Sequence, residues 1–246
     1  VFTKSQEKLA LSLLHEKKEL PNVIVLKHKD FHEGVVGLIA GKIKEKYNRP
    51  TIILAPHEKI INGEKVDVVK GSARSIEGFH IKEAFDEITH LTLGHGGHAM
   101  AGGLSIKASD FDEFDKEINK LANKYLTKED YVKKVYLDSV VSDNEIDYNL
   151  IDDIEALKPY GMGFSKPKFA INNFIVSEVN LIGKDKSHLK LKSEKENSLL
   201  LFNMAEKYEK IGSPEVVKLV GTPYVNIFNG RSSIQVIVEN DYIFRG

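Results

Sequence analysis

The chain has 246 residues, a hydrophobic fraction of 41% and a formal net charge of −1. This composition is typical of a soluble globular protein with one large domain or two ordinary domains. Cysteine is absent, which excludes disulfide bonds and thiolate metal sites and favours a cytoplasmic setting. No apolar run of about 18 residues and no signal-peptide pattern occurs, so we expect no membrane contact. The first residue is Val1 rather than Met, which indicates a piece of a longer protein.

Charge is distributed unevenly along the chain. Residues 1–126 carry a net charge of +1, residues 127–157 carry −6 and residues 158–246 carry +4. Nucleic-acid binding needs a local basic surface, so the last third is the better candidate, although a mild lysine excess is more often a solvated face. Only four arginines occur, at positions 49, 74, 231 and 245.

The first 55 residues predict a strand–helix–strand unit behind an N-terminal helix. Leucines recur at helical spacing over residues 4–18. Val23-Ile24-Val25-Leu26 is a continuous apolar run typical of a buried strand, residues 34–47 have helical spacing, and residues 51–55 form a second apolar run. Two strands that flank a helix within about 35 residues form a βαβ unit with parallel strands.

The rest of the first half continues the α/β pattern. The further predicted elements are a hairpin turn at Asn62-Gly63, strands over 66–72 and 104–107, and helices over 80–89 and 110–125. We therefore expect an α/β domain with a mixed sheet over residues 1–126, which begins with a connector helix within residues 1–20.

The second half predicts a small β-barrel. An acidic linker with a helix is expected over residues 127–157. Beyond it, turn signals separate five expected strands at 169–182, 188–192, 199–202, 216–220 and 234–239. Five strands in fewer than about 90 residues fit a Greek-key barrel of the OB type, with an SH3-like barrel or a sandwich as alternatives. The second domain is therefore placed at 127–246.

The segment Gly94–Gly103 is rich in glycine and contains two histidines. Consecutive glycines let the backbone approach a bound group closely. If Gly96-Gly97 leads into a short helix that begins near His98, free N–H groups would point at an anion such as a phosphate. The alternative is a tight glycine turn with a hydrogen-bonded histidine.

A second segment, Gly71-Ser72-Ala73-Arg74-Ser75, ends a predicted strand with hydroxyls and an arginine. The planar guanidinium group suits phosphate oxygens, and a hydroxyl completes such a site. Alone, this pattern is more often a solvated turn. We predict that Arg74 and the Gly96–His98 segment form one anion site, because each supplies half of a phosphate cradle.

A third polar segment lies between the first strand and the next helix. Asp30, His32 and Glu33 follow a parallel strand, where α/β folds place ligands. They could hold a metal, but residues so close in sequence are more plausible as caps of the helix. His32 and His95 are additional candidate site residues. No complete catalytic centre is apparent, since there is no Asp-rich cluster, nucleophile elbow or Walker loop.

These segments resemble the C-terminal part of the RecJ exonucleases, a family of the DHH phosphoesterase superfamily. Phe31-His32-Glu33-Gly34-Val35-Val36-Gly37 is similar to the family's Trp-His-x-Gly-Val-x-Gly segment, with Phe31 in place of tryptophan. Gly71–Ser75 and Gly96–Gly103 match the two signatures of the DHH-associated domain. Leu157–Gly163 resembles the entry to the family's OB-fold, although Phe164-Ser165 replaces the usual Asn-Pro.

The resemblance implies a 5′→3′ exonuclease for single-stranded DNA that acts in DNA repair and recombination, with manganese or magnesium held by a DHH domain. No Asp-His-His occurs here, so we expect no metal site in this chain, a DHH domain in cis, and no activity from this chain alone. The positions that would grip substrate phosphates are Ser72, Arg74, Gly96, Gly97 and His98. The OB-fold would guide single-stranded DNA, and other repair proteins are further expected partners.

Two other functions remain open. Oligonucleotide and cyclic-dinucleotide phosphodiesterases of the same superfamily share the glycine–histidine signature but lack the added barrel, so residues 158–246 count against them. A non-catalytic nucleic-acid-binding module, like the related domain of alanyl-tRNA synthetase, is the second. The Phe31–Gly37 segment and the barrel argue against it.

Overall fold

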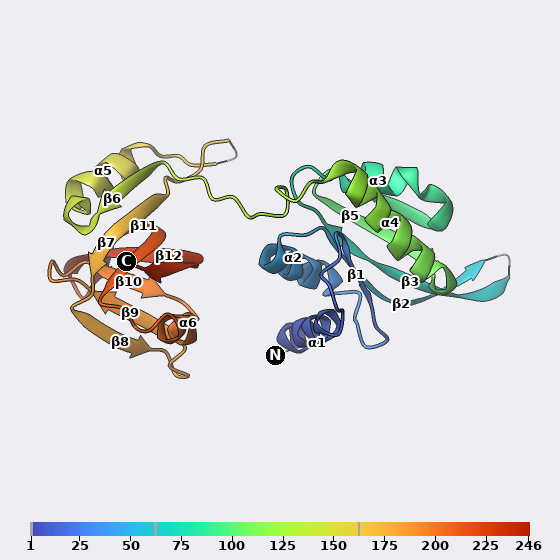
Figure 1. Ribbon diagram of the computed structural model, residues 1–246, viewed down its shortest axis with the longest axis horizontal. Coiled ribbons are helices and arrows are strands. Elements are labelled where there is room, and N and C mark those ends of the chain that lie inside the picture. Colours follow the sequence, from blue (N-terminus) through green and yellow to red (C-terminus); the bar gives the residue numbers. More distant parts are fainter. Residues whose placement is uncertain (1, 62, 162) are drawn as a thin grey trace. The chain divides into compact units, whose positions relative to one another are not determined.

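The chain folds into two compact units, Val1–Lys134 and Val135–Gly246 (Figure 1). The computed structural model describes residues 2–61, 63–161 and 163–246, with the side chains of all of these except residues 61, 240 and 241. Val1, Asn62 of the expected hairpin turn and Met162 lie outside the described residues.

A five-stranded mixed sheet forms the centre of the first unit, in the order β1-β2-β3-β5-β4. β1 and β2 are parallel and joined by α2, while the other neighbours are antiparallel. The predicted βαβ unit and mixed sheet are therefore confirmed. The strands are β1 (Ile24–Lys27), β2 (Thr51–Ile61), β3 (Glu64–Arg74), β4 (Gly94–Gly97) and β5 (Ala101–Lys107).

Helices cover both faces of this sheet (Figure 1), and each face buries its own core. Alternate residues of a strand point to opposite faces. Ile24 and Ile53 therefore pack beneath α1 and α2, while Val25 and Ile52 pack beneath α3 and α4. The helices are α1 (Phe2–His15), α2 (Val36–Tyr47), α3 (Ile81–Glu87) and α4 (Phe111–Tyr125), with 3-10 turns η1 (Thr89–Leu91) and η2 (Ala108–Asp110).

The glycine–histidine segment forms a β-hairpin, so the short helix expected near His98 is wrong. Gly94–Gly97 is the edge strand β4, paired antiparallel with β5. The His98 N–H donates to the Ala101 carbonyl at 2.8 Å, which closes a tight turn. The Ala99 carbonyl accepts from the Ile81 N–H at 3.0 Å and anchors the turn to the start of α3. The His98 N–H, which a helix N-terminus would leave free for an anion, is therefore already bonded within the hairpin.

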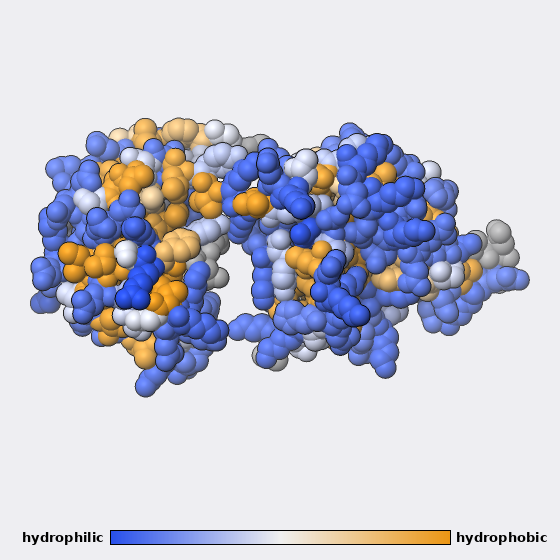
Figure 2. Space-filling view, viewed as in Figure 1, coloured by the Kyte–Doolittle hydropathy of each residue, from blue (hydrophilic) through white to orange (hydrophobic). Residues whose placement is uncertain are grey.

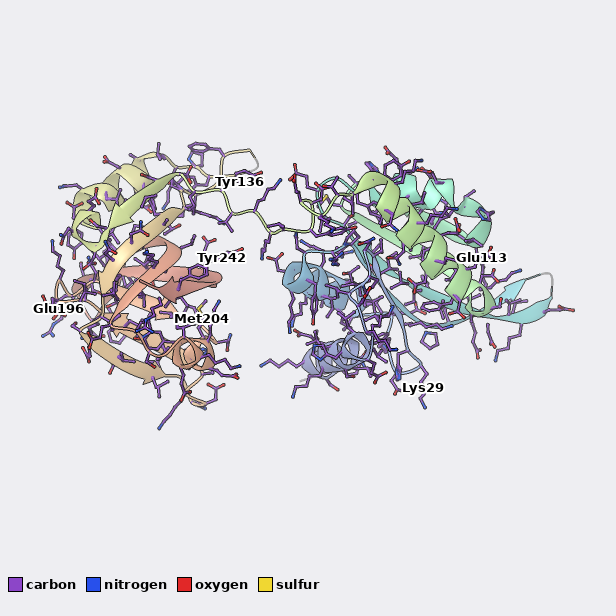
Figure 3. The ribbon with its side chains drawn as sticks, in the orientation of Figure 1. Lys29, Glu113, Tyr136, Glu196, Met204 and Tyr242 are labelled. Atoms are coloured by element: carbon purple, nitrogen blue, oxygen red, sulfur yellow. The ribbon has the colours of Figure 1, made fainter. Side chains whose placement is uncertain are left out.

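The segment after α4, residues 126–134, packs against the first unit. The Arg49 guanidinium lies 4.0 Å from the centre of the Tyr131 ring. The Asn48 side-chain amide donates to the Asp130 carbonyl at 3.2 Å. Beyond it, Tyr136 is 76% exposed and lies on the extended connection to β6 (Figure 3).

The second unit is built on one seven-stranded mixed sheet, in the order β6-β7-β11-β12-β10-β9-β8. β6 pairs parallel with β7, and β10 pairs parallel with β12. The strands are β6 (Ser139–Ser142), β7 (Phe169–Ile175), β8 (Glu178–Ile182), β9 (His188–Lys192), β10 (Ser198–Leu201), β11 (Val216–Phe228) and β12 (Arg231–Arg245). The helical segments are η3 (Asp143–Glu145), α5 (Tyr148–Ala156) and α6 (Ala205–Lys210).

Five strands of an OB-like barrel were expected here, and the structure has seven strands in one mixed sheet. Within the described residues the sheet ends at β6 on one side and at β8 on the other. The expected strand 169–182 divides into β7 and β8, because the Val176 N–H bonds to Glu215 and the Ser177 N–H bonds to Lys192. The core lies between the sheet and the helices and includes Met204, labelled in Figure 3.

The helices of the described residues are all too short or too polar to cross a membrane.

Two adjacent glycines of the β4–β5 hairpin give a matched test of the fold. Gly97 has φ = +143°, and a Cβ there would lie 2.4 Å from the Ala101 carbonyl oxygen. A Cβ on Gly96 would have no heavy atom within 4 Å. We expect Gly97→Ala to lower the free energy of unfolding by more than about 1 kcal/mol and Gly96→Ala by less than about 0.5 kcal/mol. Urea unfolding of both variants measures this, and equal stabilities would contradict the hairpin geometry.

Candidate nucleic-acid interface

The strand register brings the serine of one predicted motif level with a glycine of the other. Ser72 on β3 lies opposite Gly103 on β5, and Gly103 lies opposite Gly96 on β4. Directly opposed residues point to the same face of a sheet. Ser72 and Gly96 therefore share a face, with one strand between them and a backbone separation of about 10 Å.

The next row brings the arginine level with the residue that closes the glycine–histidine turn. Arg74 lies opposite Ala101, and the Ala101 carbonyl accepts the His98 N–H at 2.8 Å. His98 is exposed, and a Cβ at Gly96 would meet open space. The sheet surface next to Arg74 is therefore open backbone rather than packed side chains.

Gly97 and His95 belong to the opposite face. Gly97 lies opposite Gly102, where a Cβ would come within 3.1 Å of the Phe85 ring of α3. His95 Nε2 lies 2.9 Å from Asp86 Oδ1, and its ring meets the Phe85 ring edge-on at 5.9 Å between centroids. Hydrogen bonds from Lys82 and His95 lower the pKa of Asp86. His95 therefore fixes β4 to α3 and does not join Arg74.

Arg74 is the charged group best placed to meet an anion. Its Nη1 donates to Ser72 Oγ at 2.9 Å and to the Ala73 carbonyl at 2.8 Å. No carboxylate among the described residues forms an ion pair with it. A Cβ on Gly37 would lie 3.2 Å from Arg74 Nη2, so the glycine leaves room for the guanidinium beside α2.

A pocket of about 400 Å³ lies between β3 and the first turn of α2. Its lining residues are Glu33, Gly34, Val36, Gly37, Leu38, Lys70, Gly71, Ser72 and Arg74. No side chain caps the start of α2, so its first N–H groups add a partial positive charge to this pocket. The helix N-terminus predicted near His98 is absent from the described residues of that segment, and the one that lines this pocket belongs to α2.

Glu33, Gly37 and Lys70 are lining residues that the sequence reasoning did not assign to the site. The Gly34-Val35-Val36-Gly37 pattern was the available signal, because a second glycine within a predicted helix often marks a close packing contact. Lys70 lies two residues before Ser72 on β3 and therefore on the same face.

The carboxylate in this pocket has two nitrogen partners, from His57 and Lys70. Glu33 Oε1 lies 2.5 Å from His57 Nδ1, and Glu33 Oε2 lies 3.6 Å from Lys70 Nζ. Burial raises the pKa of Glu33, but the hydrogen bond from His57 and the charges of His57 and Lys70 outweigh burial, so the pKa is lowered. The ionised Glu33 thus pairs with these two groups and leaves Arg74 available.

The segment that holds Asp30, His32 and Glu33 provides no side-chain cap for α2. His32 Nδ1 accepts the Gly34 N–H at 3.1 Å, and its ring meets Phe2 edge-on. The expected side-chain cap of α2 is therefore wrong, since the helix begins after Val35 with no such bond. In residues 2–61, 63–161 and 163–246 no three His, Asp or Glu side chains are grouped to hold a metal ion. These residues do not fit a catalytic metal.

The second unit exposes several aromatic side chains. Phe164, Phe202 and Phe228 are 50%, 47% and 70% exposed, whereas Phe169 is in the core. Tyr224 is half-buried and donates to Gln235 at 2.8 Å. Hydrophobic residues interrupt the hydrophilic surface of this unit on the face drawn in Figure 2.

A second pocket, of about 430 Å³, adjoins Tyr224. Its lining residues are Ser165, Lys166, Lys168, Thr222, Tyr224, Ile237 and Glu239. Lys168 pairs with Glu239 at 2.7 Å. The pocket thus combines an aromatic ring with an ammonium group, Lys166, that no described carboxylate binds in an ion pair.

Two domain families match the chain in succession. Residues 20–124 match the DHHA1 domain, and residues 137–240 match the RecJ OB domain. Single-stranded-DNA-specific exonuclease RecJ of Haemophilus influenzae is 33% identical over 92% of this chain, and that of Bacillus subtilis is 31% identical over 94%. The chain spans 39% and 29% of the length of these two relatives.

The fold agrees with a solved structure of the same family. The crystal structure of RecJ in complex with Mg²⁺ from Thermus thermophilus superposes with a TM-score of 0.74. The match covers 99% of this chain and 36% of that one, at 23% identity. The chain therefore belongs to the RecJ family and corresponds to its C-terminal part, a DHHA1 domain followed by a RecJ OB domain.

Proposed function

We propose that this chain is the DNA-binding part of a 5′→3′ exonuclease for single-stranded DNA that acts in DNA repair and recombination. The first unit grips phosphates near the 5′ end, and the second unit guides the incoming strand. The observation that carries this proposal is the register that places Ser72, Arg74 and Gly96 on one sheet face, with the His98 N–H bonded to Ala101 in the adjoining turn. The RecJ OB domain counts against a cyclic-dinucleotide phosphodiesterase, which as a family lacks it.

The proposed phosphate site has three kinds of donor. Arg74 supplies a charged planar fork, Ser72 a hydroxyl, and the start of α2 a set of backbone N–H groups. His98 and the exposed backbone around Gly96 extend the same face toward the edge of the sheet. Because Glu33 is already paired with His57 and Lys70, an arriving phosphate meets the free side of Arg74.

In this proposal the described residues bind and orient DNA, and a DHH domain in cis carries out the hydrolysis. A divalent metal, when bound by a DHH domain in cis, would activate the attacking water. Metal ligation is assigned to that domain because the described residues do not fit a metal. Other repair proteins are further proposed partners of the complete enzyme.

Removal of the Arg74 guanidinium tests the phosphate site. We expect Arg74→Ala to weaken binding of a 5′-phosphorylated single-stranded oligonucleotide by about 1.5–3 kcal/mol, the range for hydrogen bonds to a charged group. Arg245→Ala removes the same charge from an exposed position on β12 and should leave affinity nearly unchanged. Fluorescence anisotropy measures both affinities. Arg74→Lys keeps the positive charge and removes the planar guanidinium group, so it tests whether that planar group is needed. Equal losses in the two alanine variants would refute the site.

Salt dependence tests the role of the second unit. Affinity for single-stranded DNA should fall steeply with salt, with a logarithmic slope of about −0.7 for each neutralised phosphate. Lys166→Ala should make this slope shallower by about 0.7. Lys65→Ala is the control, because Lys65 pairs with Glu58 on the first unit at 2.6 Å. Affinity that does not change between low and high salt would exclude DNA binding along the surface of the second unit.

Activity of the isolated chain gives a third test. We expect the purified chain to release no nucleotides from single-stranded DNA in the presence of manganese, since metal-activated water is the expected chemistry. Release measured with a preparation free of contaminating nuclease would place metal ligands within this chain and contradict the proposal.

A further inference from the structure

A two-stranded arm projects from the sheet of the second unit. β7 pairs with β11 only over Val216–Gly221, and β10 pairs with β12 only over Gln235–Ile237. The pairing of β11 with β12 continues out to Phe228 opposite Arg231. Residues 222–234, here named the hairpin arm, therefore lie largely beyond the neighbouring strands. Asn229 and Gly230 close it with φ values of 50° and 74°, as a tight type I′ turn requires.

The tip of the hairpin arm is apolar and exposed. Ile227 is 72% exposed and Phe228 is 70% exposed. The only charged residue of the arm is Arg231, and no Asp or Glu occurs between Glu215 and Glu239. Large apolar side chains at a projecting tip mark a contact site. The lack of acidic groups and the presence of Arg231 favour a negatively charged partner.

Another long ribbon in the same chain differs from the hairpin arm because charged residues surround its exposed apolar residue, Ile60. The β2–β3 ribbon of the first unit is also long, with pairing out to Ile61 opposite Glu64, yet it carries Glu58, Lys59, Glu64 and Lys65 near its end. Lys65 pairs with Glu58 at 2.6 Å, and both are well exposed. Charged residues of this kind keep a ribbon edge solvated.

One side of the hairpin arm adjoins a pocket, and the other side adjoins the core of the second unit. Tyr224, Asn226 and Phe228 alternate along one side, which begins at the pocket lined by Lys166 and Tyr224. Val225 and Ile227 lie on the other side, and Val225 packs against the core of the unit. A DNA strand that passes the pocket and Tyr224 would thus reach the tip of the hairpin arm, where Phe228 lies on one side and Ile227 on the other.

We propose that the hairpin arm is a strand-separating wedge. Where a single strand bound along this side continues into a duplex, Phe228 and Ile227 meet the first base pair and unstack it, while Arg231 neutralises an adjacent phosphate. Apolar side chains inserted between bases are known to unstack them, and an aromatic ring can replace the lost base stacking. The inference rests on the proposed binding of single-stranded DNA and adds an activity at the junction with a duplex.

The test uses the whole chain and a DNA with a 5′ single-stranded tail joined to a duplex. 2-Aminopurine replaces the first paired adenine at the junction, because its fluorescence rises when it is unstacked. We expect the wild-type chain to raise this fluorescence by about twofold or more, and Phe228→Ala to remove the rise. Phe228→Trp should retain it. Ile60→Ala removes a residue that is 75% exposed on the β2–β3 ribbon and serves as the matched control.

Affinity for the tail alone separates this proposal from the proposed function. We expect Phe228→Ala to change that affinity by less than about threefold, because the tip acts at the junction rather than along the tail. Tail binding without a rise in fluorescence would overturn the wedge alone. An equal rise with Phe228→Ala would also overturn it. No salt-dependent binding to the tail would overturn the proposed function and the wedge with it.

Discussion

The pairing of β3 with its two neighbours is the constraint on which the candidate interface depends. β3 lies between β2 and β5, and a Cβ on Gly71 would fall 1.9 Å from the Ile53 carbonyl oxygen. This close approach to β2 is possible only with glycine. A slip of one residue would turn Ser72 and Arg74 toward α3 and bury an arginine in an apolar core. The hydrophobic alternation on both faces therefore also fixes where the polar groups point.

The elements with a hydrophobic period were predictable from the sequence, and the glycine-rich ones were not. Buried runs gave β1 and β2, and helical spacing gave α2 and α4 to within a few residues. β4 consists of Gly94-His95-Gly96-Gly97 and has no apolar alternation, so its strand is specified by pairing with β5 rather than by local preference. The order of seven strands in the second unit depends on long-range pairing in the same way.

The candidate site was predictable in composition but not in geometry. Ser72, Arg74 and Gly96 share a face, and His98 lies in the turn that follows Gly97. Gly97 and His95 point to the opposite face because side chains alternate along a strand, and His32 lies in the turn before α2. The helix N-terminus beside Arg74 comes from α2, which a sequence far from both motifs supplies. Such a juxtaposition arises from the βαβ connection and cannot be derived from either motif alone.

The attachment of the segment after α4 sets the length of the tether between the two units. Lys133 pairs with Glu45 on the first unit, and on the other side the Asp138 N–H bonds to the Lys168 carbonyl at 2.9 Å. Only residues 134–137 remain between these anchors, so the Cα atoms of Lys133 and Asp138 lie at most about 18 Å apart when the chain is fully extended. With a tether this short, a DNA strand held by one unit is present at the other unit at an effective concentration in the millimolar range or above. In the proposed function, two individually weak sites on one chain would then hold one DNA strand with the avidity of a bivalent binder.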